Sequence, residues 1–159
     1  MNINFLAIES SRPSWASEAF QDYSSRFDRS INVNWQGLKP IKRHLNYNVD
    51  KAIVQESNLL LSATKEKDYL VCLDKSGKSF NTLGLKSKFE NWLISSNNLT
   101  FLIGGPDGVS RECLDKCNES WSLSPLTFPH AIVPVLIIEQ VYRVWSVSYT
   151  HLRAHETQS

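Results

Sequence analysis

A glycine-rich turn ends the apolar stretch Phe101–Gly108, and these residue types suit the binding of a ligand. The stretch reads Phe-Leu-Ile-Gly-Gly-Pro-Asp-Gly, so an apolar strand-like run leads directly into two glycines. A ligand can press against bare backbone at glycine, and ligands of open α/β sheets collect at the carboxyl ends of strands. The pattern therefore indicates a binding loop. A tight turn at Asp107 and Gly108, between a strand and a helix, is the alternative interpretation.

A second stretch, Trp121–His130, combines apolar and turn residues and follows the first along the chain. The first stretch has neither Gly-x-Gly-x-x-Gly spacing nor a Gly-Lys-Ser/Thr end, which excludes a dinucleotide fingerprint and a P-loop. Together the two stretches predict a cofactor site made of loops rather than of charged side chains.

Three polar residues near the last helix each allow two interpretations. His130 follows Pro129 at the start of that helix, so its imidazole either functions in a loop or bonds to the backbone at the helix start. Glu139 and Arg143 have i, i+4 spacing in the favourable order. They form either a plain surface pair or, because the helix is otherwise apolar, part of an interface or substrate groove.

The cysteine and histidine spacings do not predict a metal site. Cys113 and Cys117 are four residues apart on an expected helix, but no second ligand pair with zinc-type spacing accompanies them. His151 and His155 share the same spacing near the chain end, where disorder is the usual expectation. No serine or cysteine lies in a nucleophile elbow, so a nucleophilic triad is not supported either.

Length and composition favour one soluble globular domain. The chain has 159 residues, of which 42% are hydrophobic and 21% charged. No run approaches the length of an uncharged membrane span, and the N-terminus is typical of a first strand rather than of a signal peptide. Three cysteines give no disulfide framework, which favours a reducing cytoplasm. A net charge of +1 neither supports nor excludes nucleic-acid binding.

Apolar runs alternate with helical patterns along the chain. The expected strands are residues 3–8, 31–36, 69–73, 99–103 and 121–123. Pro13 is expected to open the first helix, with a stripe of Trp15, Ala19, Tyr23 and Phe27, and a second helix is expected over Val49–Leu61. Ser79 or Asn81 would cap a third helix with Phe89, Trp92 and Leu93 buried, and Ser110 would cap a fourth that runs to about Asn118. The last helix is expected to have an apolar face that consists of Val133, Leu136, Ile137, Val141, Val144 and Trp145. Residues 74–78 are expected to form a turn. This order predicts an α/β fold with a mostly parallel sheet.

Three C-terminal motifs carry a resemblance to a known family. They are Phe101–Gly108, Ser122–His130 and Glu139–Trp145, in this order and spacing. They closely resemble the ribosomal large subunit pseudouridine N3-methyltransferases, the RlmH family, which are small members of the SPOUT class of knotted methyltransferases. Weaker similarity extends upstream, through the first helix and through Cys72–Gly77, so that it covers about residues 1–148.

The resemblance implies a fold, a reaction and partners. It implies a SPOUT-type, mostly parallel sheet flanked by helices, with a deep trefoil knot in the C-terminal third, and a cytoplasmic homodimer. It implies S-adenosylmethionine as the methyl donor and N3 of a pseudouridine in 23S rRNA of the assembled ribosome as the acceptor, with no membrane involved. Residues 1–148 are then a single methyltransferase domain, and residues 149–159 are an atypical tail.

The resemblance also implies which residues bind the cofactor. Leu73 and Gly104 would contact it at the ends of two strands. A third segment would wrap around it in the knot, and it consists of Leu123, Ser124, Pro125, Leu126, Thr127 and Phe128.

The sequence departs from the family in two places. Residues 148–157 lack the family's Pro, Tyr and His after the position of His151, and they resemble translated sequencing-adapter read-through. Pro134 stands where the family usually has Arg, although proline is compatible with a first helical turn. A knotted protein that binds the cofactor but is catalytically impaired is therefore the alternative function.

The near-neutral charge argues against tight binding to naked RNA, because phosphate affinity scales with the lysines and arginines that neutralise phosphates. Recognition would then depend on the assembled ribosome. Lys39, Lys42 and Arg43 are candidate phosphate contacts, and a solvated loop is the alternative interpretation of this segment.

Overall fold

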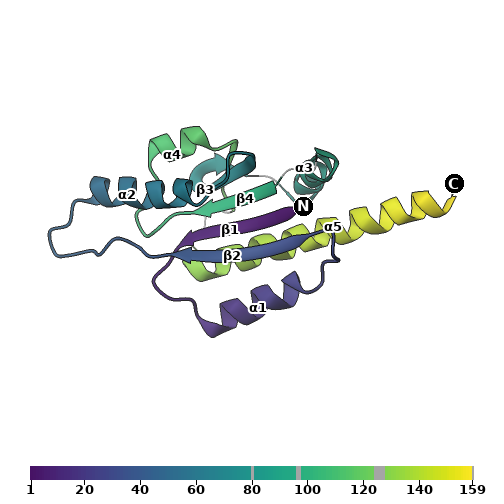
Figure 1. Cartoon of the computed structure of the whole chain (residues 1–159), viewed down its shortest axis with the longest axis horizontal. Helices are drawn as coiled ribbons and strands as arrows, with labels where there is room; N and C mark the ends of the chain where they lie inside the picture. The colour runs from purple at the N-terminus through teal and green to yellow at the C-terminus, as the bar shows by residue number, and fades with distance from the viewer. Residues whose placement is uncertain (80, 96–97, 124–127, 159) are drawn as a thin grey trace.

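Five parallel strands form a single sheet in the order β2-β1-β4-β3-β5 in the computed structural model of the chain (Figure 1). The structure describes residues 1–79, 81–95, 98–123 and 128–158, with side chains as far as residue 148. The strands are β1 (Asn2–Ile8), β2 (Asn32–Leu38), β3 (Asp68–Lys78), β4 (Asn98–Ile103) and β5 (Glu119–Trp121). The predicted α/β fold with a parallel sheet is confirmed.

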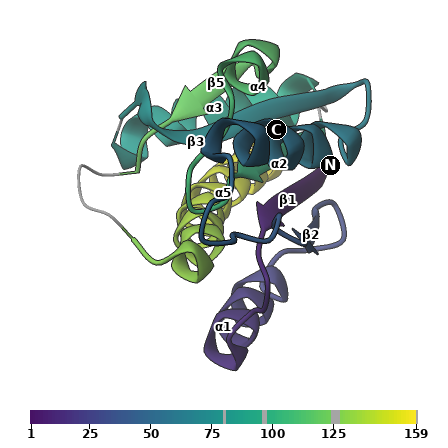
Figure 2. The ribbon, with the colours of Figure 1, turned by 90° about the vertical axis from the view of Figure 1, so that its left-hand side faces the viewer.

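Helices cover both faces of this sheet. Figures 1 and 2 show α1 and α5 below the strands and α4 above them. The helices are α1 (Ser14–Ser24), α2 (Val49–Ser62), α3 (Thr82–Ser95), α4 (Arg111–Lys116) and α5 (Val133–Gln158), with the short 3-10 helix η1 (His130–Ile132) before α5. A parallel sheet needs this arrangement, because each crossover between its strands places a helix on one face.

Side chains of β1 alternate between two apolar clusters, one on each face. Ile3, Phe5 and Ala7 belong to the larger cluster, which includes buried residues of α1, α3 and α5. Leu6 and Ile8 belong to the smaller cluster, which includes residues of α2 and α4. Successive side chains of a strand point to opposite faces of the sheet, so β1 contributes residues to both apolar clusters.

Two predicted helix caps are found in the structure. The Asn81 side chain accepts a hydrogen bond from the Gly84 backbone N–H at 2.9 Å, so it starts α3, whereas the Ser79 hydroxyl bonds to the Ser122 carbonyl. The Ser110 hydroxyl accepts from the Cys113 N–H at 3.1 Å and starts α4. Short polar side chains at these positions satisfy backbone donors that have no partner within the helix.

The buried face of α1 differs from the predicted stripe. Trp15 is 48% exposed, whereas Ala16 and Phe20 are buried. The helix ends at Ser24, so the buried Phe27 lies beyond it. The buried residues keep the predicted spacing of four, but the buried stripe lies one residue later in the sequence than predicted.

The predicted turn at residues 74–78 is wrong, because β3 continues through it to Lys78. The register with β5 shifts between Leu73 and Lys78, where the strand contains an irregularity. The paired part of β5 is Glu119–Trp121 rather than the predicted 121–123. The extension of β3 carries polar residues, so it has none of the apolar signal that marks a buried strand.

The apolar stretch His130–Ser148 has the length and composition of a membrane span, which the sequence analysis did not anticipate. Ile137, Ile138 and Val141 of this stretch are nevertheless buried in the larger cluster, against the sheet. α5 also packs along α1 and α3. Apolar side chains of this stretch therefore pack within the fold, as those of an amphipathic helix do.

Glu119 of β5 is the centre of a polar network at the edge of the sheet. Its carboxylate accepts from Lys88 Nζ at 2.7 Å, from Trp121 Nε1 at 3.2 Å and from the Tyr69 hydroxyl. Burial acts to raise the pKa of Glu119, but these donors outweigh it and lower that pKa. Burial and the bond to Glu119 raise the pKa of Tyr69 to about 12.

We expect the Tyr69 hydroxyl to make the chain sensitive to alkali. Its pKa is about 12 in the folded chain and about 10 in an unfolded one. The folded state holds the proton more tightly, so the stabilisation is complete below about pH 10 and is lost as pH rises toward about 12. Urea-unfolding midpoints at about pH 9, 10 and 11 measure this loss. The Tyr69→Phe variant should lose less stability over this range; an identical pH dependence in both proteins would contradict the assignment.

Candidate functional site

A cavity of about 390 Å³ opens where β4 and β5 end, beside residues 73–75 in the middle of β3. This is the edge at which parallel sheets bind ligands, and the volume lies in the range of small-molecule sites. Its walls are mainly apolar side chains and loop backbone. The lining residues are Leu73, Asp74, Lys75, Ile103, Gly104, Gly105, Pro106, Asp107, Gly108, Trp121, Ser122, Leu123, Phe128, His130 and Val133.

The loop Gly104–Gly108 is both a tight turn and a wall of the cavity, so the two interpretations of its sequence are compatible. The Gly108 N–H donates to the Gly105 carbonyl at 3.0 Å, and Gly108 has a φ of 85°. A Cβ at Gly104 would lie 2.7 Å from Val109 Cγ1 and 2.9 Å from the backbone of Gly108. Only glycine therefore allows the loop to fold back this closely on itself.

The structure places four of the predicted cofactor residues around this cavity. Gly104 directly follows β4, and Leu123 and Phe128 lie after β5. Leu73 lies within β3 rather than at its end, because β3 continues to Lys78. The other four, Ser124, Pro125, Leu126 and Thr127, lie outside the described residues. A role in cofactor binding remains a prediction for all eight.

Two polar lining residues, Asp74 and Lys75, were not singled out as site residues from the sequence. Asp74 and Lys75 follow the apolar run of β3, and Trp121 ends β5. Trp121 is buried and stacks on Trp92, with 5.8 Å between ring centroids. The signal that could have found Asp74 and Lys75 is their position in the sequence, since they directly follow the apolar run that ends in the cofactor candidate Leu73.

A second cavity, of about 370 Å³, shares Trp121, Ser122, Leu123 and Phe128 with the first. Its remaining walls come from α3, the residues before it, and α5, and they are Asn81, Thr82, Leu85, Leu136, Ile137 and Gln140. The residues that follow β5 thus border hollows on two sides, which suits a segment that encloses a ligand.

The residues singled out in and before the last helix lie at the cavity, on the helix surface and in its first turn. His130 is exposed, begins η1 and lines the first cavity. Arg143 donates to Glu139 of the same helix, so the predicted i, i+4 pair is confirmed. Pro134 is buried in the first turn of α5, and the helix forms around it as predicted.

The fold brings three cysteines together in the smaller apolar cluster. The Sγ atoms of Cys72, Cys113 and Cys117 lie within 4.8 Å of one another. The spacing of Cys113 and Cys117 was visible in the sequence, and the fold adds Cys72 from β3. All three lie in the smaller apolar cluster among leucine and isoleucine side chains, where a free cysteine packs as a small hydrophobic residue.

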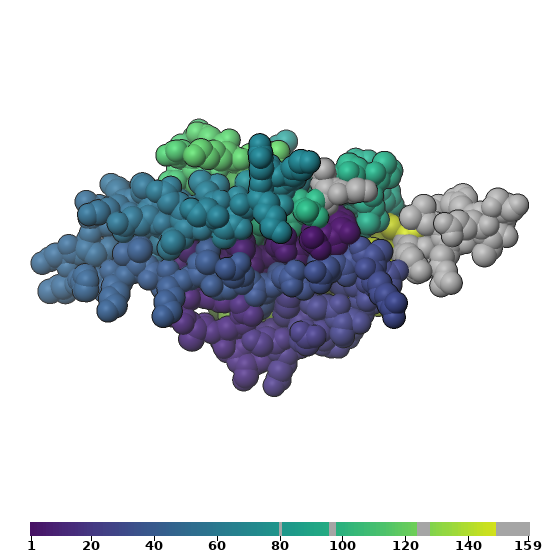
Figure 3. All heavy atoms as spheres, in the orientation of Figure 1, coloured from purple at the N-terminus to yellow at the C-terminus, as the bar shows by residue number. Residues whose placement is uncertain are grey.

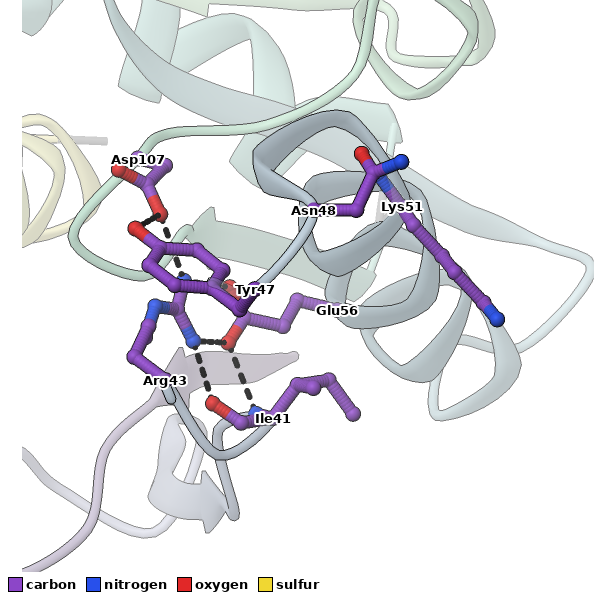
Figure 4. Close-up of polar contacts among 7 residues, drawn as sticks. All are labelled: Ile41, Arg43, Tyr47, Asn48, Lys51, Glu56 and Asp107. Atoms are coloured by element: carbon purple, nitrogen blue, oxygen red, sulfur yellow. Dashed lines mark hydrogen bonds and ion pairs between the residues drawn. The ribbon is translucent and has the colours of Figure 1, made fainter. Parts of the chain in front are cut away.

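The basic segment before α2 divides into solvated and buried residues. Lys39 and Lys42 are exposed. Arg43 is instead only 19% exposed and forms ion pairs with Glu56 and Asp107 (Figure 4). Its guanidinium is therefore committed to contacts within the chain rather than available to an RNA phosphate.

The chain is similar in sequence to a protein family and to named relatives over nearly its whole length. Residues 1–152 match a family model described as "Predicted SPOUT methyltransferase". Proteins called ribosomal RNA large subunit methyltransferase H from Dichelobacter nodosus and Coxiella burnetii are each 36% identical to it over 151 residues, which cover 95% of this chain and 97% of theirs. The protein of that name from Teredinibacter turnerae is 38% identical over 154 residues, which cover 95% and 98%.

Proposed function

Because the chain belongs to the SPOUT methyltransferase family, we propose that it transfers a methyl group from S-adenosylmethionine to N3 of a pseudouridine in 23S rRNA of the large ribosomal subunit. The observation that carries this proposal is the cavity beside β3 and at the carboxyl ends of β4 and β5, which is lined by Leu73, Gly104, Leu123 and Phe128. These residues come from the motifs that resemble the pseudouridine methyltransferases.

The described residues fit S-adenosylmethionine. Leu73, Leu123 and Phe128 would offer apolar walls to the flat adenine, and backbone groups of the Gly104–Gly108 loop would bond to its polar edges. Residues 124–127 complete the proposed binding segment. When bound, the cofactor supplies a methyl group that its sulfonium already activates.

The protein would then bind the methyl donor and align it with the acceptor, rather than activate the methyl group. The acceptor nitrogen must lie in line with the methyl group, and residues 73–75 of β3 with the loops that follow β4 and β5 would hold the donor for this approach. N3 of pseudouridine carries a proton that must leave, so a nearby base or a stabilised anion accelerates the step. His130 is an imidazole on the cavity wall.

The remaining parts of the proposal concern assembly. We infer a cytoplasmic homodimer in which residues 1–148 form a single methyltransferase domain with a trefoil knot in its C-terminal third, as in the family that the motifs resemble. The substrate is the assembled ribosome rather than naked rRNA, since the net charge of +1 provides little general affinity for phosphate.

A methylation assay on purified ribosomes tests the proposal. With radiolabelled S-adenosylmethionine, we expect label to enter 23S rRNA of ribosomes that lack the modification, and little label to enter deproteinised rRNA. Mass spectrometry of the digested rRNA then identifies the methylated nucleoside. Cofactor binding by calorimetry without any transfer would instead support the alternative of a catalytically impaired protein, which the relatives' names do not favour. The absence of binding would contradict both.

A further inference from the structure

The loop Gly104–Gly108 is held in place by α2 and by the segment before it, residues 39–48, which lie outside the motifs of the proposed site. In the space-filling view this segment and the start of α2 form one end of the molecule, at the left in Figure 3. Glu56 and Ser57 of α2 are both buried and polar. Their positions suggest a function, because buried polar groups persist where they have specific partners.

Glu56 is the anchor of this network. Its carboxylate binds both terminal nitrogens of the Arg43 guanidinium, Nη2 at 2.8 Å, and accepts from the Ile41 N–H at 2.9 Å (Figure 4). Such a two-bond pairing fixes the orientation of the guanidinium as well as its position. A Cβ at Gly105 would lie 2.6 Å from Glu56 Oε1, so the loop itself packs against this carboxylate.

Arg43 also reaches the loop directly. Its Nη2 donates to Asp107 Oδ2 at 3.1 Å, and the Tyr47 hydroxyl donates to the same oxygen at 3.1 Å. Asp107 lies at the tip of the Gly104–Gly108 turn and lines the first cavity. One guanidinium thus joins a buried carboxylate of α2 to a carboxylate on the wall of the site.

A third contact holds the far end of the loop. The Ser110 N–H donates to the hydroxyl of the buried Ser57 at 2.8 Å. The loop is therefore held at Gly105, at Asp107 and at Ser110, and each contact traces to α2 or to the segment before it.

We propose that Arg43 is a positioning residue, which holds the Gly104–Gly108 loop through Glu56 and Asp107 in the shape that binds S-adenosylmethionine. The inference rests on the proposed function of this cavity. It assigns a role to residues of the N-terminal half that contact neither the donor nor the acceptor. Lysine cannot replace the arginine, because a single ammonium cannot engage both carboxylates in this fixed geometry.

The test compares Arg43→Lys with Arg12→Lys. Arg12 is a matched control: it is 25% exposed, pairs with Glu9 at 2.7 Å and lines neither cavity at the proposed site. By calorimetry we expect Arg43→Lys to raise the Kd for S-adenosylmethionine about tenfold with unchanged stoichiometry, and Arg12→Lys to leave the Kd unchanged. A merely structural role would lower the stoichiometry or the melting temperature and leave the Kd of the folded fraction unaltered.

A double-mutant cycle separates holding of the loop from direct contact. If Asp107 acts by being held, Asp107→Asn should weaken binding as Arg43→Lys does, and the double variant should be no weaker than either. Additive losses would overturn the proposal, as would unchanged affinity in both single variants. Asp107→Asn and Tyr47→Phe leave the Glu56 pair intact, so they test the idea even if Arg43→Lys fails to fold.

The same titrations distinguish this inference from the proposed function. If the unsubstituted chain binds S-adenosylmethionine and the variants bind it equally well, only the role of Arg43 is wrong. If the unsubstituted chain does not bind it, the proposed function fails and the inference fails with it. In turnover assays on ribosomes, we expect Arg43→Lys to raise the KM for the cofactor while kcat at saturating cofactor and the KM for ribosomes stay near their original values.

Discussion

Replacing Gly104 with valine is expected to weaken the binding of S-adenosylmethionine by about 100-fold or more while the chain remains folded. Even a single Cβ at this position would lie 2.9 Å from the carbonyl carbon and oxygen of Gly108, and backbone cannot move aside as a side chain can. The turn between Gly104 and Gly108 would have to open. The cavity would then lose the wall that these residues form.

Calorimetry with S-adenosylmethionine measures the loss, and circular dichroism with thermal unfolding verifies the fold. Gly37→Ala is the control, since a Cβ there would also meet a close neighbour, the side chain of Glu9, at a place that lines neither cavity. Both variants should lose some stability through overpacking, about 1–3 kcal/mol. If Gly104→Val bound the cofactor as tightly as Gly37→Ala does, the proposed site would be wrong.

Truncation of Phe101 to alanine should lower the free energy of unfolding by about 3–5 kcal/mol, more than any other substitution proposed above. Phe101 is fully buried at the centre of the sheet, on β4. Its ring stacks on Phe5 of β1 at 5.0 Å and meets Trp121 of β5 at 5.3 Å between centroids. The substitution leaves a cavity between the rings of Phe5 and Trp121, which a close-packed core does not close by collapse.

Chemical denaturation gives the free energy directly, and the melting temperature should fall by about 6–20 °C. Leu83→Ala on α3 is the control, because Leu83 is 73% exposed and its removal should change stability by less than about 0.5 kcal/mol. Equal effects of the two substitutions would show that Phe101 does not hold the sheet together.

The core elements were predictable because their signals are local. The apolar run Leu99–Ile103 predicted a doubly covered strand, and every residue from Leu99 to Ile103 is buried. Asn81 and Ser110 predicted helix starts, since a cap acts on backbone groups only a few residues away. The boundaries were less certain: the polar continuation of β3 through residues 74–78 was missed because pairing with β5 stabilises it.

The candidate site was predictable only in part. Gly104 was recognisable because a strand followed by two glycines implies a close backbone approach, and the resemblance of the surrounding motifs identified a use for it. Glu56 gave a weaker signal that was overlooked. It lies between Ala52 and Leu60 on the buried stripe of α2, where a carboxylate needs a partner.

The sequence by itself determined where the helices and the apolar parts of the strands lie, because periodicity and capping act over a few residues. Only the tertiary structure decided that Arg43 joins Glu56, 13 positions away, to Asp107, 64 positions away. It likewise brought Cys72 to Cys113 and Cys117. Contacts of this kind depend on the strand order β2-β1-β4-β3-β5, which brings distant loops to one edge of the sheet, and no local pattern records that order.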